Sequence, residues 1–400
     1  MKKLIALSLM AAVAAWTLGP AFAGAVTTGS ANTDLERGAG GGTAPIVKAK
    51  WEMKGPSFSG SSYVGYYDGE GKDDSTAAGA QFNAPGEWNA NMNYTVCAVV
   101  TDPNGASDIF GVYADIYYPT DRKMHKSMDP AEIDNPSGGC GAFIEENTLI
   151  KLSKTDALDL FCNHVRDGNE NLTTFNDPYF TGLGLSSRSQ RYEEICGVYG
   201  ELQKEEAYVY CDDKKIKWED PAGNYRVDVN ALDQAGNSSD VLTNNFTYQP
   251  LTAFEKDFIG VNYGQVLLDT HKKIAGDTQF GTAAYPTVRN LGNTRLNMNV
   301  AQDDMGLGMS SGLWNVEYDA RVGNNEEHWS DYGPFKYKGD SGEPTTETWE
   351  SLNEILDLSE TEEMDFSILI KKWPDAEQTY SGEMWLKATY ANFTVCGTPQ

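Results

Sequence analysis

Between residues 225 and 248 the chain reads as two adjoining stretches in which polarity alternates at every second residue. The apolar positions of the first stretch run from Tyr225 to Ala231, and polar residues stand between them. This period of two is typical of a strand with one buried face. Residues 233–239 are rich in turn formers, and a second strand is expected over 241–248. The pattern predicts an antiparallel hairpin, and the rest of the chain must supply the sheet that completes it.

The N-terminus carries the pattern of an export signal. Lys2 and Lys3 precede an apolar run over 4–18, and Ala21-Phe22-Ala23 forms a small-x-small cleavage site. We therefore expect residues 1–23 to be a removed signal peptide and the mature protein to be secreted, extracellular or at the cell surface. Residues 24–45 are rich in Gly, Ser and Thr and are expected to form a flexible arm.

Charge and hydropathy limit the partners. The formal net charge of −27 becomes −29 once Lys2 and Lys3 are removed. An acidic surface of this size repels nucleic acid and anionic lipid. No stretch after residue 23 is long and apolar enough to span a bilayer, so no membrane insertion is expected after signal cleavage. Self-assembly, other envelope proteins and glycans are the partners that remain.

Four more strands are expected in the first half, the last of them over 206–211. Residues 46–53 alternate between apolar side chains and Lys48, Lys50 and Glu52, which predicts an edge-like strand with its charges facing outward. Residues 93–100 and 109–118 follow, joined by a turn rich in Asp, Asn and Gly. The stretches VVTDPNGASDIFGVYADI (99–116) and YRVDVNALDQAGNSSD (225–240) resemble the B–C and F–G strand pairs of bacterial and archaeal immunoglobulin-like surface domains. The resemblance implies a sandwich over 46–250.

A segment at about 119–206 is too long for a sandwich loop and is read as an insertion. Leu158, Phe161, Cys162 and Val165 have helical spacing, with Thr155 as the expected N-cap. The same spacing recurs in a second helix, at Tyr192, Ile195, Cys196 and Tyr199. Each cysteine therefore lies in an apolar stripe, and packing of the two helices predicts a Cys162–Cys196 disulfide.

Residues 251–400 are expected to form a second β-sandwich. Strand patterns occur over 258–268, 287–300, 314–321, 364–371 and 380–390, with Gly-, Asn- and Asp-rich spacers such as 290–293. PTVRNLGNTRLNMNV (286–300) and YSGEMWLKA (380–388) are similar to strands of prokaryotic surface-layer and biofilm-fibre proteins. The predicted fold is thus mainly β, with two antiparallel sandwich domains, the first immunoglobulin-like and carrying a disulfide-linked helical hairpin.

Exported cysteines are expected to pair. Cys140 and Cys211 flank the insertion, so a bridge between them would staple its base. A Cys97–Cys396 bridge would then join the two units. The alternative is Cys97–Cys211 across neighbouring strands, which would leave Cys140 and Cys396 to each other or to another molecule.

Two turns of similar composition contain oxygen ligands for a hard cation. Calcium is expected if the loops meet at one end of the sandwich, and no other cofactor is required. The alternative is that Asp and Asn are present only as turn formers. The candidate ligands are Asp102, Asn104, Asp108, Asp233, Asn237 and Asp240. Sequons mark five candidate glycosylation sites, at Asn93, Asn171, Asn237, Asn245 and Asn392.

Catalytic motifs are not evident. The four histidines are scattered, without H-E-x-x-H. The G-x-S-x-G match at 308–312 has no helix pattern after it, so no nucleophile elbow is expected there. The sequence therefore favours a structural or cell-surface protein, the subunit of an extracellular layer, sheath or fibre. The alternatives are a binding module with Trp314, Trp329 and Trp349 exposed for a carbohydrate or protein ligand, and a secreted hydrolase.

Overall fold

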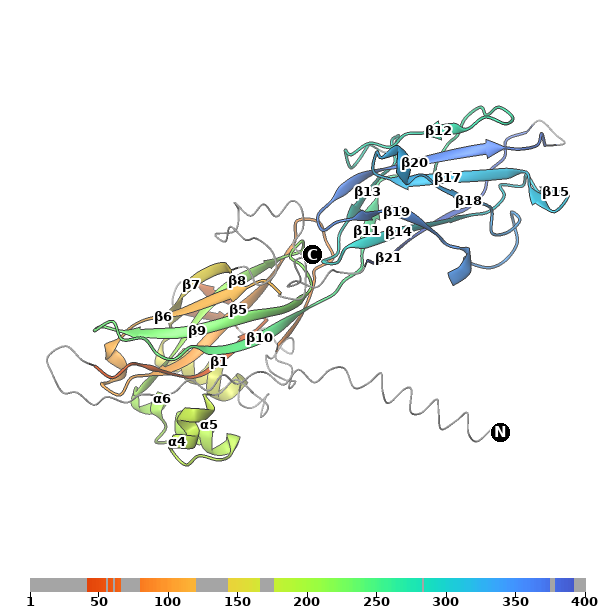
Figure 1. The fold of residues 1–400 in the computed structure, drawn as a ribbon. Helices are drawn as coiled ribbons and strands as arrows, with labels where there is room; N and C mark the ends of the chain where they lie inside the picture. Colours follow the sequence, from red (N-terminus) through yellow and green to blue (C-terminus); the bar gives the residue numbers. More distant parts are fainter. Residues whose placement is uncertain are drawn as a thin grey trace, which may run out of the picture.

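The computed structural model describes residues 42–54, 57–59, 62–65, 80–119, 143–165, 176–282, 284–374 and 378–391. The predicted signal peptide and most of the arm lie outside these residues. The fold is mainly β, and Figure 1 shows its two groups of sheets toward opposite ends of the molecule. No hydrophobic core cluster of the described residues contains side chains from both sides of residue 250. No described helix is long and apolar enough to cross a membrane.

The first group is an eight-stranded sheet in the order β1-β5-β8-β7-β6-β9-β10-β4. Its ladders are antiparallel except for the β10–β4 pair. The sheet folds over so that β1 lies against β9 and β10. The bounds, in chain order, are β1 Ile46–Met53, β4 Gln81–Asn83, β5 Asn91–Thr101, β6 Ile109–Tyr117, β7 Phe143–Lys151, β8 Ala207–Lys217, β9 Gly223–Asp233 and β10 Leu242–Gln249, and a small hairpin adds β2 Ser57–Ser59 and β3 Ser62–Gly65.

The predicted hairpin of 225–248 is present as β9 and β10. Tyr225 is paired with Phe246 across the ladder, and their rings stack with centroids 5.0 Å apart. Phe82 and Tyr94 pack against the same Phe246 ring, at 5.3 and 5.0 Å. The alternating apolar side chains of this hairpin therefore form the centre of the core between the two halves of the folded sheet.

Helices cover the outer face of β1, β5 and β8. Their bounds are α2 Lys154–Ala157, the π-helix η2 Leu158–Val165, α4 Asp177–Gly182, α5 Arg188–Cys196 and α6 Glu201–Lys204. Phe161, Phe180 and Ile195 are fully buried against Trp51 and Val209 of the sheet. Cys162 is bonded to Cys196, so the disulfide-linked helical hairpin is confirmed.

Three details of the insertion differ from the predictions. The first helix begins two residues earlier, because Ser153 rather than Thr155 caps it by accepting the N–H of Asp156. The second helix ends at Cys196, and Tyr199 is 83% exposed beyond it. The segment also contains β7, which pairs with β6 and β8 and belongs to the main sheet.

β1 lies at the edge of the sheet, as predicted, but its charges do not face outward. Lys48, Lys50 and Glu52 are fully buried, as are the apolar residues between them. The helical layer covers one face of β1, and β9 and β10 cover the other. A strand enclosed on both faces buries charges as well as apolar groups, and each buried charge then needs a partner.

Two predicted disulfides are also wrong. Cys97 is bonded to Cys211, because β5 and β8 are neighbours and place the two residues directly opposite each other. This is the alternative pairing, and it rules out Cys140–Cys211 and Cys97–Cys396. Cys140 and Cys396 lie outside the described residues.

The second group is a pair of antiparallel sheets. One has the order β11-β13-β20-β17-β18 with β12 also on β20, and the other has the order β19-β14-β21. Their facing sides enclose the third core. The bounds are β11 Phe254–Lys256, β12 Lys272–Ile274, β13 Thr287–Asn290, β14 Leu296–Gln302, β15 Met309–Ser310, β16 Leu313–Trp314, β17 Val316–Val322, β18 Ser330–Tyr332, β19 Glu350–Leu356, β20 Thr361–Ile370 and β21 Met384–Tyr390, with single turns η3 Glu326–His328 and η4 Thr346–Thr348.

Two strand predictions fail in this half. Residues 258–268 are irregular chain rather than a strand, although Phe258 and Tyr263 are buried in the core. Residues 287–300 form two strands in different sheets, β13 and β14, because the chain turns at 291–295.

That turn joins the two groups. Asn293 is fully buried, and its backbone oxygen accepts the N–H of Ala222 at 2.9 Å. Its side-chain oxygen accepts the N–H of Leu251 at 2.7 Å, and its amide nitrogen donates to the carbonyl of Gln249 at 2.9 Å. One asparagine thus binds three points of the first unit and the connecting segment.

Aromatic packing supports the same junction. Trp88 and Trp218, from the first group, pack with ring centroids 4.4 Å apart. The guanidinium of Arg289, on β13, lies 4.5 Å from the Trp88 ring centroid. Cation–π contact of this kind adds a second set of interactions across the connection.

Candidate metal centre and neighbouring sites

The two acidic turns meet at one end of the first sheet. The first turn runs from the end of β5 through the single turn η1, Ala106–Asp108, into β6. The second follows β9. Because β6 pairs with β9 and Ile109 stands opposite Asp233, the two turns are held side by side. The two loops therefore come together, and three of the six predicted ligands, Asp102, Asp108 and Asp233, lie in one cluster.

Three carboxylates form the centre of the cluster. Asp102, Asp108 and Asp233 each place an oxygen within 4.8 Å of the others. Asp102 is 4% exposed, and its Oδ1 accepts the N–H of Asn104 at 2.7 Å. Its Oδ2 is buried without a hydrogen-bond partner in the structure. A buried anionic oxygen is costly unless a positive group neutralises it.

The pKa values of Asp102 and Asp233 are shifted in opposite directions. Burial raises the pKa of Asp102, and the nearby charges of Asp108 and Asp233 raise it further, against a lowering by the Asn104 N–H. Burial also acts to raise the pKa of Asp233, but its net pKa is lowered by hydrogen bonds from Asn237 and from the N–H groups of Ala235 and Gly236. A divalent cation would relieve the repulsion that Asp102 experiences.

The side-chain amides of Asn104 and Asn237 hold the end of the arm. Asn104 donates its amide to the carbonyl of Thr43 at 3.1 Å, and Asn237 donates to the carbonyl of Gly42 at 2.9 Å and to Asp233 at 2.7 Å. A Cβ at Gly42 would lie 3.0 Å from both Asn104 and Asp233. Asp240 is exposed and is not part of the cluster.

The donor set suits calcium better than a softer metal. Calcium takes six to eight oxygen ligands from carboxylates, carbonyls and water, in flexible geometry. Three carboxylates from two loops supply an anionic oxygen cage that water would complete. The residues that would hold the ion are Asp102, Asp108 and Asp233.

A second polar group lies on the second unit around His271. Its Nδ1 is 2.9 Å from Asp319 and 3.1 Å from the hydroxyl of Ser367. A hydrogen bond with Asp319, then burial, raises the pKa of Asp331 to about 6. Activation of a serine needs the carboxylate and the hydroxyl on different ring nitrogens. Both contacts involve the same nitrogen here, so this arrangement does not activate Ser367.

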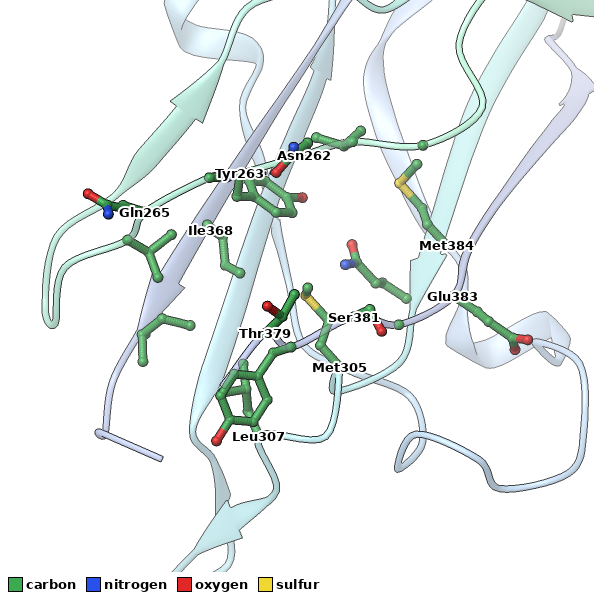
Figure 2. A pocket seen from close by; sticks show the side chains of 18 of the residues that line it. Asn262, Tyr263, Gln265, Met305, Leu307, Ile368, Thr379, Ser381, Glu383 and Met384 are labelled. Carbon is green, nitrogen blue, oxygen red and sulfur yellow. Dashed lines mark hydrogen bonds between the residues drawn. The ribbon is translucent and has the colours of Figure 1, made fainter. Parts of the chain in front are cut away.

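A groove of about 1530 Å³ opens beside the irregular segment 257–271. Figure 2 shows Tyr263, Met305 and Met384 directed into it, while Glu383 points away. Ile259, Leu267 and Trp373 line the groove and remain exposed. Sequence patterns missed this groove, because 258–268 has the alternation of a strand and carries no sign that it stays unpaired.

The remaining candidates are dispersed. Trp314, Trp329 and Trp349 are half-buried, so the expected exposed aromatics are not at these positions. Trp329, for example, lies between Lys273 and Arg321. Asn93 on β5 and Asn245 on β10 are exposed sequon residues, while Asn237 is engaged in the cluster. Asn171 and Asn392 lie outside the described residues.

Together these features define a disulfide-bonded protein built of paired β-sandwiches, with an acidic cluster in the loops at one end. No family model and no curated sequence matches the chain. Among solved structures, the C-terminal domain of the Streptococcus pyogenes antigen I/II-family protein AspA is 11% identical, at a TM-score of 0.20 over 86% of this chain and 96% of that one. The C-terminal domain of the Streptococcus agalactiae AgI/II polypeptide BspA is 10% identical, at 0.17 over 87% and 100%. A chaperone–tip adhesin complex of CFA/I fimbriae is 7% identical, at 0.19 over 78% of each. Similarity this low supports no argument about fold or function.

Proposed function

We propose that the protein is a secreted structural or cell-surface protein that forms a subunit of an extracellular layer, sheath or fibre. The observation that carries this proposal is the junction at Asn293. Its three hydrogen bonds and the Trp88–Arg289 contact brace the connection between the two sandwich groups. A protein that transmits force or keeps a lattice spacing needs such a braced connection, whereas a flexible linker would serve neither purpose.

The acidic surface fits the same role when calcium is present. Subunits with a mature net charge of −29 repel one another at close range. Calcium in the cluster of Asp102, Asp108 and Asp233 would tie the end of the arm to two loops of the first unit. Calcium on the remaining acidic surface would lower the repulsion between neighbours.

Assembly tests the proposal directly. The purified mature protein is examined by electron microscopy and sedimentation velocity with millimolar calcium and with a chelator. We expect sheets, fibres or large oligomers in calcium that disperse on chelation. A protein that stays monomeric in calcium at high concentration, without sheets or fibres, contradicts the structural role.

The groove beside segment 257–271 favours a second candidate, a binding module for an apolar or aromatic portion of a carbohydrate or protein ligand. Exposed Ile259, Leu267 and Trp373 at its margin are the kind of side chains that a ligand would cover. Trp373→Ala would weaken binding in a glycan or peptide array, and Trp349→Ala, outside the groove, is the matched control. Unchanged array signals for Trp373→Ala would contradict this candidate.

A further inference from the structure

We propose that Lys50 and Asn244 become joined by an amide bond within the chain, and that Glu52 moves the protons in this reaction. The three side chains meet between β1 and β10. Lys50 and Glu52 are fully buried, and Lys50 Nζ donates a hydrogen bond to Asn244 Oδ1. The bond would modify the protein covalently, independently of the surface role proposed above.

Glu52 is placed to serve both reacting groups. One carboxylate oxygen accepts from Lys50 Nζ at 2.6 Å, and the other accepts from Asn244 Nδ2 at 2.7 Å. A single carboxylate thus bridges the nucleophile and the leaving group. General acid–base catalysis requires a proton carrier within hydrogen-bond reach of both atoms, and this geometry provides it.

The attack requires an uncharged amine, which a proton transfer within the buried pair would supply. Proton transfer from Lys50 to Glu52 turns a buried ion pair into a neutral amine and a neutral acid, which a dry interior accommodates at lower cost than two charges. The carbonyl of Val227 accepts a further hydrogen bond from Nζ, at 3.1 Å, and holds the amine in place. Fixed contact between the reacting groups replaces a bimolecular encounter, and exclusion of water protects the product from hydrolysis.

The reaction balances without a further reactant. The neutral Nζ attacks Cγ of Asn244 and forms the Nζ–Cγ bond. Glu52 returns its proton to Nδ2, the Cγ–Nδ2 bond breaks, and the nitrogen leaves as ammonia. The second proton lost by Nζ reaches the leaving ammonia through Glu52, so ammonium departs and the Glu52 carboxylate is restored.

The position of the bond has a mechanical consequence. β1 and β10 are the strands through which the chain enters the first unit and leaves it for the second, and they are not paired with each other in the sheet. The amide would connect residues 194 apart in sequence. Tension applied between β1 and β10 would pass through this covalent bond. The part of the first unit that lies between the two strands in sequence would therefore not be extended.

Lys48 provides an internal comparison on the same strand. It is also fully buried beside a glutamate, Glu201. Its Nζ lies 4.2 Å from the ring centroid of Tyr179. Neither neighbour carries a carboxamide, so Lys48 has no Asn side chain to attack at these contacts. Substitutions at this pair therefore test whether any buried Lys–Glu pair produces the same result.

Mass spectrometry of the reduced, denatured mature protein tests the proposal. We expect the wild type to be lighter than its sequence by about 17 Da, the mass of the ammonia released in this acyl transfer. Trypsin should leave peptide 49–54 attached to peptide 227–256, because an acylated Lys50 is not cleaved. Glu52→Gln, which keeps the shape of the side chain, should have its full mass and release free Lys50 peptides. Glu201→Gln, the matched control, should keep the mass loss.

Two results would overturn the proposal. The first is a wild-type protein of full sequence mass whose chain is cleaved after Lys50. The second is a Glu52→Gln protein that still carries the linked peptides. The wild-type mass decides the matter even where a variant fails to fold.

Discussion

Replacement of Asn293 by alanine probes the junction between the two groups of sheets. The side chain is fully buried, and truncation removes its hydrogen bonds with the N–H of Leu251 and the carbonyl of Gln249. The backbone contact with Ala222 survives. A half-buried polar group that loses its partner costs roughly 1–3 kcal/mol, so we expect a loss of about 2–4 kcal/mol in the free energy of unfolding.

The assay is urea denaturation followed by tryptophan fluorescence, which reports on Trp88 and Trp218 beside the junction. For units of this size, the loss corresponds to a decrease in Tm of roughly 5–15 °C. Asn293→Asp keeps the acceptor for Leu251 but buries a carboxylate whose other oxygen faces the carbonyl of Gln249. Because a buried charge without a partner is costly, this variant should be at least as destabilised as the alanine variant at neutral pH.

The control is Asn324→Ala, because Asn324 is exposed and its hydrogen bond from Arg321 is accepted by its backbone oxygen, which the substitution keeps. This variant should remain within about 0.5 kcal/mol of the wild type. If the free energy of unfolding of Asn293→Ala is also within about 0.5 kcal/mol of the wild type, Asn293 does not brace the junction.

Three further predictions concern the clusters and the disulfide. Calcium at a hundredfold excess over its Kd should stabilise the wild type by about 2.7 kcal/mol. Asp108→Asn should abolish this stabilisation, and Asp240→Asn, the control at an exposed position outside the cluster, should keep it. If calorimetry shows that calcium stabilises both variants equally, the site is excluded. The pKa of Asp331 is raised in the fold to about 6, so its stabilising contribution is present below pH 4 and lost as pH rises through 6. Asp331→Asn should therefore flatten the dependence of Tm on pH over that interval, and an unchanged profile contradicts this. The double variant Cys97→Ala/Cys211→Ala should lose about 2–5 kcal/mol in urea titrations, and a loss below 1 kcal/mol would show that the bridge contributes little.

Local patterns predicted the features that depend on neighbours in sequence. The alternation from Tyr225 to Ala231 identified a strand with one buried face, and the turn after it produced the β9–β10 hairpin. The shared spacing of Phe161 and Cys162 with Ile195 and Cys196 predicted a bonded helical pair. In each case the periodicity of one element determines which of its side chains share a face, and the prediction holds because two such faces pack against each other in the structure.

Predictions failed where a third element intervened. The same alternation in β1 predicted charges that face outward, but the helical layer and the strands β9 and β10 enclose both of its faces. The alternation of 258–268 gave no sign that this segment would find no strand to pair with. Asn293 looked like an ordinary turn residue, because its three partners come from residues 222, 249 and 251.

The sequence by itself determined the mainly β fold, the two turns that contain Asp102 and Asp233, and one of the two disulfides among the described residues, because each depends on local periodicity or composition. Only the tertiary structure decided that Cys97 meets Cys211, because strand order in a sheet is not encoded in any single strand. It also decided that Lys50, Glu52 and Asn244 meet in the core. A lysine in an alternating strand is indistinguishable from a solvated one until the strand that covers it is known.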